Sequence, residues 1–156
     1  GQDIRALDVG VGGGKVLGLT RGLGIGDNDL VGIDISPKML ALVNDLYPGI
    51  DLREADISDS SVLHSLSDKF PLQLVTAHMV FNHLNDKQLR LALFNIFNLL
   101  SDNGIFVGLV PYPNNPAKFD VLKDSSSGYS SLEDALGEEK LFIITVRLWL
   151  ILNIWN

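Results

Sequence analysis

The sequence contains no cysteine. It therefore offers no disulfide bond and no thiolate to zinc, to an iron–sulfur cluster or to a substrate, and we predict neither a metal site nor a redox role. A chain without cysteine is also compatible with the reducing cytoplasm, which is the location that we expect.

Basic residues are scarce as well. The chain has 12 lysine and arginine residues against 19 aspartate and glutamate residues, which gives a formal net charge of −7. Proteins that bind nucleic acid usually gather lysine and arginine on one face. This composition therefore disfavours nucleic acid as a substrate or partner.

The apolar run over residues 141–155 is short and contains Arg147. A membrane-spanning helix needs roughly 20 apolar residues, so we expect no membrane partner and interpret the run as a buried pair of strands. The 156 residues, 46% of them hydrophobic, suffice for one domain with a sizeable core. The chain begins with Gly1 rather than methionine, almost directly on its first expected strand, so we expect a start cut from a longer chain.

Short apolar segments alternate with amphipathic segments along the chain. This order is typical of a parallel sheet flanked by helices, and it predicts an α/β fold. Ser36 is predicted to cap a helix that begins at Pro37, and Asn103-Gly104 is predicted to turn the chain after the last helix. Strands are predicted at residues 4–9, 30–34, 50–55, 72–77 and 105–109, and helices at 14–22, 37–46, 59–66 and 86–100.

The composition changes after the last of these strands to stretches rich in proline and serine. Residues 111–138 show no periodicity and are predicted to form a loop or an insertion. The segment follows the carboxyl end of a strand, where open α/β sheets bind ligands, so it is a candidate for contact with a substrate. A disordered connection explains the same composition equally well.

A glycine loop over residues 10–14 follows the first predicted strand, with Asp8 before it and glycine at Gly10, Gly12 and Gly14. Without Cβ atoms, such a turn lets backbone N–H groups approach a ligand. The dinucleotide-binding pattern requires a further glycine at the position of Lys15. An acid at the start of the loop instead suits a cationic amine. The pattern therefore favours a ligand with an amino group, a carboxylate and an adenosine, such as S-adenosylmethionine.

Two further carboxylates end later strands. Asp34 ends the second predicted strand, where a carboxylate accepts hydrogen bonds from both ribose hydroxyls. Ile35 and Met39 are predicted to cover a face of the adenine, although packing in a helix core explains Met39 equally well. Asp56 is predicted to accept from the adenine amino group, and the adjoining Ile57 to supply a backbone donor to a ring nitrogen. The alternative for Asp56 is an ordinary helix cap; the two other acids favour the cofactor role.

Together these residues resemble the class I S-adenosylmethionine-dependent methyltransferases over residues 4–110. The resemblance implies that the glycine loop holds the methionine half of S-adenosylmethionine, that Asp34 binds the ribose, and that Asp56 with Ile57 binds the adenine. It also implies a Rossmann-like three-layer α/β/α sandwich, with a mostly parallel sheet and an antiparallel C-terminal edge.

Residues 72–84 resemble the fourth-strand region of the family, with Gln73 where the family commonly carries an acid. The resemblance implies that the backbone of Ala77 and His78 borders the sulfonium. The helix that usually precedes the first strand is absent, and residues 142–150 at most represent the final strands. We therefore expect residues 1–156 to form a single methyltransferase domain that is truncated at both ends and whose sheet is incomplete.

The reaction that the resemblance implies is methyl transfer by in-line displacement, and the predicted acceptor is a small organic molecule. No catalytic residue is assigned: His78 and His83 are candidates for a base, and the alternatives are that they line the pocket or cap the next helix. Two other functions stay open. One is a non-catalytic or truncated methyltransferase-like binding domain, and the other is an NAD-dependent oxidoreductase, which Lys15 and Asp8 oppose. The oligomeric state is not predicted.

Overall fold

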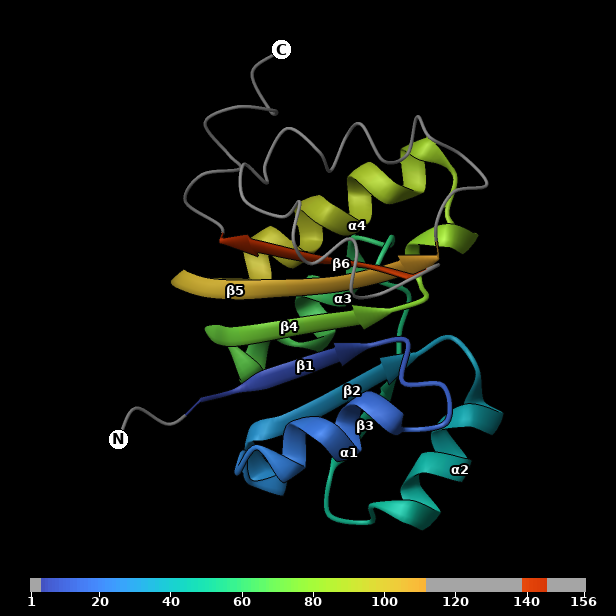
Figure 1. Cartoon of the computed structure of the whole chain (residues 1–156), viewed down its shortest axis with the longest axis vertical. Helices are drawn as coiled ribbons and strands as arrows, with labels where there is room; N and C mark the ends of the chain where they lie inside the picture. The colour runs from blue at the N-terminus through green and yellow to red at the C-terminus, as the bar shows by residue number, and fades with distance from the viewer. Residues whose placement is uncertain (1–3, 112–138, 146–156) are drawn as a thin grey trace.

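The computed structural model describes residues 4–111 and 139–145 of the chain, which form one six-stranded sheet in the order β3-β2-β1-β4-β5-β6 (Figure 1). The first five strands pair in parallel, and β6 is antiparallel to β5. This topology confirms the predicted Rossmann-like fold with an antiparallel edge at its C-terminal end. The strands are β1 (Ala6–Val9), β2 (Leu30–Asp34), β3 (Asp51–Glu54), β4 (Leu72–His78), β5 (Leu100–Pro111) and β6 (Glu139–Thr145).

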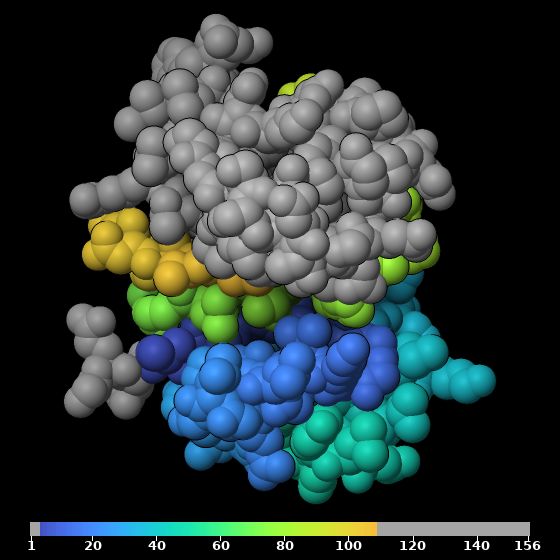
Figure 2. Space-filling model, viewed as in Figure 1, coloured from blue at the N-terminus to red at the C-terminus, as the bar shows by residue number. Residues whose placement is uncertain are grey.

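Helices cover both faces of the sheet, because the side chains of its central strands are apolar on both sides. On β1, Leu7 and Val9 pack into a core with helices α3 and α4, whereas Ala6 packs on the opposite face with α1 and α2. Figure 2 shows α1 (blue) on the face turned toward the viewer. All four residues of β1 are buried, as expected for a strand covered on both faces, and Asp8 is the one that is not apolar. The helices are α1 (Lys15–Gly22), α2 (Pro37–Leu46), α3 (Ser61–Ser65) and α4 (Asp86–Leu99), with 3-10 turns η1 (Asp27–Asp29), η2 (Ser67–Lys69) and η3 (Phe81–His83).

The predicted start of α2 is confirmed. Ser36 is its N-cap, Pro37 occupies the first helical position, and the Ser36 hydroxyl accepts a hydrogen bond from the Met39 N–H at 3.4 Å. Helix α4 begins with a capping box, in which the Asn85 side chain and the Gln88 side chain each accept from the backbone N–H of the other. These caps fix where α2 and α4 leave the carboxyl edge of the sheet.

The turn predicted at Asn103-Gly104 is wrong, because α4 ends at Leu99 and the chain enters β5 directly. Leu72 pairs with Leu100, whereas Leu74 pairs with Ile105, so residues 101–104 form an irregularity within the strand rather than a helix end. Glycine suits this place because a Cβ on Gly104 would lie 2.7 Å from the Leu100 side chain. The other predicted strand and helix ends inside residues 4–99 agree with the structure to within one or two residues.

The C-terminal predictions are only partly within the described residues. Strand β5 continues to Pro111, which pairs with Glu139, so Pro111 belongs to a strand rather than to the predicted loop. The rest of that loop, residues 112–138, and residues 146–155 of the predicted strand pair lie outside the described part. In the parts that the structure describes, no helix has the length and apolarity to cross a membrane, and no three histidine, aspartate or glutamate side chains are grouped to hold a metal ion.

Candidate functional site

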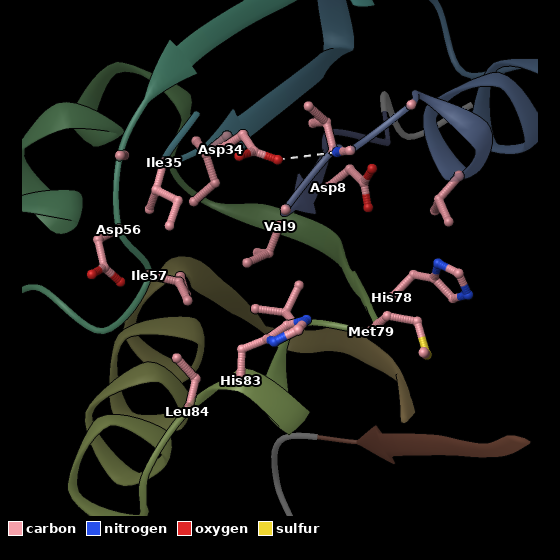
Figure 3. Close-up of a pocket in the computed structure, with 18 of the residues that line it drawn as sticks. Asp8, Val9, Asp34, Ile35, Asp56, Ile57, His78, Met79, His83 and Leu84 are labelled. Atoms are coloured by element: carbon pink, nitrogen blue, oxygen red, sulfur yellow. Dashed lines mark hydrogen bonds between the residues drawn. The ribbon is translucent and has the colours of Figure 1, made fainter. Parts of the chain in front are cut away.

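A cavity of about 650 Å³ opens at the carboxyl ends of β1, β2, β3 and β4 (Figure 3). Parallel pairing aligns these ends, since Val9 lies beside Ile33 and Ala77, and Asp34 lies beside Glu54. Side chains far apart in the sequence therefore surround one space. Eight of the eleven residues predicted to bind the cofactor line it: Asp8, Gly10, Gly12, Asp34, Ile35, Asp56, Ile57 and His78.

The glycine loop bends sharply from β1 toward α1. Gly10, Gly12 and Gly14 have φ angles of 69°, 48° and 80°, in the left-handed region that favours glycine. At Gly10 there is also no space for a side chain, because a Cβ would lie 2.5 Å from a methyl group of Val80. The loop therefore requires glycine for its backbone conformation and for its close approach to the chain after β4.

Most N–H groups of the glycine loop already donate to the protein. The Gly10 and Val11 N–H groups donate to the Ile33 carbonyl at 2.8 and 3.1 Å, and the Gly14 N–H donates to the Val11 carbonyl at 2.8 Å. The Gly12 N–H donates to Asp34 Oδ2 at 3.0 Å (Figure 3). The prediction that the loop offers its N–H groups broadly to a ligand therefore needs correction, because four of them hold the loop in shape.

The donors that remain lie slightly further along the chain. The N–H groups of Gly13, Lys15, Val16 and Leu17 have no hydrogen-bond acceptor among residues 4–111 and 139–145. Three of these belong to the first turn of α1, and helix N-termini favour anions. Lys15 and Val16 line the cavity, and Lys15 is the only lysine or arginine of the described residues that does so. This corner of the cavity can hold a carboxylate.

Asp34 joins the glycine loop to the start of α2. Its Oδ2 accepts from the Gly12 N–H at 3.0 Å, and its Oδ1 accepts from the Ser36 N–H at 2.9 Å. The side chain is half-buried and lines the cavity. A carboxylate oxygen accepts more than one hydrogen bond, so both oxygens keep the capacity to accept from a diol.

Asp8 is the most buried acid of the site, with 3% of its surface exposed. Burial raises the pKa of its carboxyl from 3.8 to about 7; the 2.7 Å hydrogen bond donated by the Thr76 hydroxyl opposes this rise, and the charge of Asp34 adds to it. A buried carboxyl with a raised pKa is stabilised as an anion by a nearby cation. Asp8 is therefore suited to a cationic amine at the bottom of the cavity.

Asp56 begins the turn that precedes α3, and it lines the cavity. Its Oδ1 accepts from the Ser58 N–H at 2.8 Å and from the Ser58 hydroxyl at 2.7 Å, while Oδ2 has no hydrogen-bond partner in the described part of the chain. The helix-cap alternative is wrong, because α3 begins at Ser61 with Ser60 as its N-cap, and Asp56 holds the turn at residues 56–59 instead. The adjoining Ile57 is buried and lines the cavity.

Three predicted residues do not line the cavity. Gly14 faces α2, where a Cβ would meet Tyr47 and Val43 at 3.2 and 3.3 Å, so it supports the loop from behind. Met39 lies within α2 and is 37% exposed, outside both the cavity and the core. The side chain of Ala77 packs into the core with α3 and α4.

Several residues that follow β4 and line the cavity were not predicted from the sequence. Met79 has a φ of 60°, an uncommon conformation for a residue with a side chain, and strain of this kind gathers at functional sites. Met79, Val80 and Leu84 give the cavity apolar lining here. His78 and the more exposed His83 line the cavity as well (Figure 3). Gln88 also lines the cavity, and its Asn-x-x-Gln spacing is a recognisable capping box.

A family model described as a methyltransferase domain matches residues 6–104. The chain belongs to this methyltransferase family. The match covers every strand that surrounds the cavity, and it confirms the predicted family of class I S-adenosylmethionine-dependent methyltransferases together with its cofactor. Comparison with curated protein sequences gives no match.

Solved methyltransferase structures share the fold. A TehB-like S-adenosylmethionine-dependent methyltransferase from Corynebacterium glutamicum is 17% identical with a TM-score of 0.70, and the match covers 93% of this chain and 81% of that one. S-adenosylmethionine-bound CalS10 from Micromonospora echinaspora is 26% identical with a TM-score of 0.58, covering 69% of this chain and 42% of that one.

A methyltransferase from Mesorhizobium loti is 22% identical with a TM-score of 0.57, and the match covers 70% of this chain and 48% of that one. This methyltransferase domain therefore spans about half the length of some of the relatives that it matches.

Proposed function

We propose that this domain binds S-adenosylmethionine in the cavity at the carboxyl edge of its sheet and transfers the methyl group to a small organic acceptor. The observation that carries the proposal is the convergence of Asp8, Asp34 and Asp56, from three different strand ends, around one cavity beside the glycine loop. These three acids lie 22 to 48 residues apart in the sequence, and the sheet topology brings them together.

Each acid suits a different polar part of the cofactor. Asp8 faces the amino group of the methionine half, and the first turn of α1 with Lys15 takes its carboxylate. Asp34 accepts from the ribose hydroxyls while it holds the Gly12 N–H. The Oδ2 of Asp56 accepts from the adenine amino group, the Ile57 N–H donates to a ring nitrogen, and Ile35 covers one face of the base.

S-adenosylmethionine supplies an electrophilic methyl group when it is bound. The residues of this chain contribute position and surroundings rather than covalent chemistry. The rigid strand ends that carry the three acids orient the cofactor, and the apolar lining by Met79, Val80 and Leu84 excludes water from the acceptor. His78, directly after β4, is the candidate to remove a proton from the acceptor.

Three observations support a small acceptor. The net charge of −7 and the acids around the cavity disfavour a polyanion such as nucleic acid. The solved relative CalS10 is described as an amino pentose methyltransferase, so this fold can accommodate small substrates. A cavity with this apolar lining and two histidines suits an uncharged organic molecule with a hydroxyl, amine or thiol group.

The test is transfer of an isotopically labelled methyl group from S-adenosylmethionine to a panel of small hydroxyl, amine and thiol compounds, with RNA, DNA and protein as alternative acceptors. We expect label in small organic products. In the same assay, His78→Gln should lower kcat about 10-fold or more and remove the acidic limb of the pH profile, because a histidine base must be deprotonated to act.

His83→Gln is the matched control, since His83 is more exposed and its ring contacts the Asn82 amide at 3.4 Å. We expect it to keep the wild-type pH profile. Unchanged profiles for both variants would exclude a histidine base. Label only in macromolecules would contradict the small acceptor, and cofactor binding without transfer to any acceptor would favour the binding-only alternative.

A further inference from the structure

The buried face of α4 contains one polar side chain, Asn95. It is 2% exposed, and its neighbours on that face of the helix are apolar: Leu89, Ala92, Leu93, Ile96 and Leu99. A buried amide is costly unless its hydrogen bonds are made, so its presence among these residues needs a reason. The reason is found in its contacts across the core.

Asn95 binds the loop that follows β3. Its Nδ2 donates to the Ile57 carbonyl at 2.8 Å and to the Asp59 carbonyl at 3.0 Å. Because both partners are carbonyl acceptors, they fix which end of the amide faces the loop. A helix 36 residues or more away in the sequence therefore holds the two ends of this short turn.

The held loop leads directly to the exposed carboxylate of Asp56. The peptide group between Ile57 and Ser58 accepts from Asn95 at its carbonyl, and at its N–H it donates to Asp56 Oδ1 at 2.8 Å. One peptide plane thus connects the buried amide to the acid. Because Oδ1 is held in this way, Oδ2 remains the oxygen that is available to the cavity.

We infer that Asn95 is a positioning residue for recognition of the adenine. By fixing the peptide between Ile57 and Ser58, it orients the Asp56 carboxylate and keeps the Ile57 backbone in place to read the edge of the base. This inference rests on the proposed function, and it assigns a binding role to a residue that does not line the cavity.

The test compares calorimetric affinities for S-adenosylhomocysteine and for S-inosylhomocysteine, in which a carbonyl oxygen replaces the adenine amino group. The wild-type chain should prefer the adenine ligand about 10-fold or more, because the analogue places a carbonyl oxygen against the Asp56 carboxylate and an N1–H against the Ile57 N–H. Asn95→Leu keeps the branched shape of the side chain and removes both donors. We expect it to reduce this preference to about twofold or less, whatever its effect on the absolute affinity.

Asn95→Asp is the second variant, which keeps the shape of the side chain and, when protonated, one donor toward the loop. Its carboxyl donates only when protonated, so the adenine preference should fall as the pH rises, a dependence that loss of packing does not produce. The control is Leu99→Ala, a buried position one turn further along α4 that makes no side-chain hydrogen bond to the loop, and it should keep the wild-type preference.

The outcomes separate the two proposals. If wild type binds neither ligand, the proposed function fails, and the role of Asn95 fails with it. If wild type shows the adenine preference and the Asn95 variants keep it to within about twofold, the positioning role alone is wrong. An equal loss of preference in Leu99→Ala would also overturn it, because general destabilisation would then explain the effect.

Discussion

Replacing Asp34 with alanine is expected to lower the affinity for S-adenosylhomocysteine by about 100-fold or more. Two hydrogen bonds from ribose hydroxyls to a charged acceptor are lost, each worth roughly 1.5–3 kcal/mol. The Gly12 and Ser36 N–H groups also lose their acceptor, so the glycine loop and the start of α2 are no longer tied together. The effect on binding should therefore exceed that of removing a ribose contact alone. Calorimetric titration measures it directly.

The chain offers a matched control for Asp34 on the neighbouring strand. Glu54 lies beside Asp34 in the β2–β3 register, is exposed, and does not line the cavity. Glu54→Ala removes the same charge and should change the affinity by less than about threefold. Asp34→Asn keeps one oxygen acceptor, and its affinity for S-adenosylhomocysteine should lie between those of Asp34→Ala and Glu54→Ala. An affinity of Asp34→Ala within about threefold of wild type would contradict the ribose role.

Asp8→Asn is expected to raise the stability of the free protein near pH 8 while it weakens cofactor binding. The pKa of Asp8 rises from 3.8 in the unfolded chain to about 7 in the fold, so the folded state binds the proton more tightly. The free energy of unfolding therefore falls as the pH rises from about 4 to about 7, and above that range the full destabilisation by ionised Asp8 is present. The upper limit of this destabilisation is about 4 kcal/mol.

Urea denaturation at several pH values tests this prediction, with pH from about 5 to 8 as the useful window. Hydrogen bonds from Arg53 lower the pKa of Asp51 and Asp68, and these acids lose their contribution only at more acidic pH, as they become protonated. The wild-type chain should lose stability across the window and Asp8→Asn should not. Asp45→Asn, at an exposed position of α2, should follow the wild type.

The same substitution is expected to lower the affinity for the cofactor, although it raises the stability of the free protein. An amide cannot compensate the charge of an ammonium group, so Asp8→Asn should bind S-adenosylhomocysteine about 10-fold or more weakly at pH 8. Higher stability with lower affinity is typical of a residue that is costly to bury and retained for function. A variant that is less stable than wild type at pH 8, or that binds as tightly, would contradict the role of Asp8.

The fold could be predicted because its strands and helix starts have local sequence patterns. Most residues of the strands 6–9, 30–34 and 72–78 are apolar, with glycine, proline or aspartate at their bounds, and Ser36-Pro37 marks a helix start by chemistry that needs no distant partner. The three acids are recognisable because Asp8 is the second-last residue of its strand, Asp34 ends its strand, and Asp56 closely follows one. Because the strands are predicted to be parallel, the acids near their carboxyl ends are predicted to converge.

The features of the site that the sequence did not predict depend on contacts between residues far apart in the chain. The Gly12 N–H is taken by Asp34, 22 residues away, so the sequence could not show that it is unavailable to a ligand. Asn95 reads as an ordinary polar residue of an amphipathic helix, and only its two acceptors across the core reveal its role. The left-handed backbone of Met79 has no signal in its own residue type, because glycine or asparagine is the usual occupant.

Calorimetric titration of the 156-residue chain with S-adenosylhomocysteine, set against the same titration with NADH, decides whether the cavity binds the methyl-donor cofactor. One molecule of S-adenosylhomocysteine should bind per chain, with a dissociation constant on the order of micromolar, and NADH should give no measurable heat. Binding of NADH in preference to S-adenosylhomocysteine would contradict this role of the cavity, and so would an affinity for S-adenosylhomocysteine that Asp34→Ala leaves unchanged.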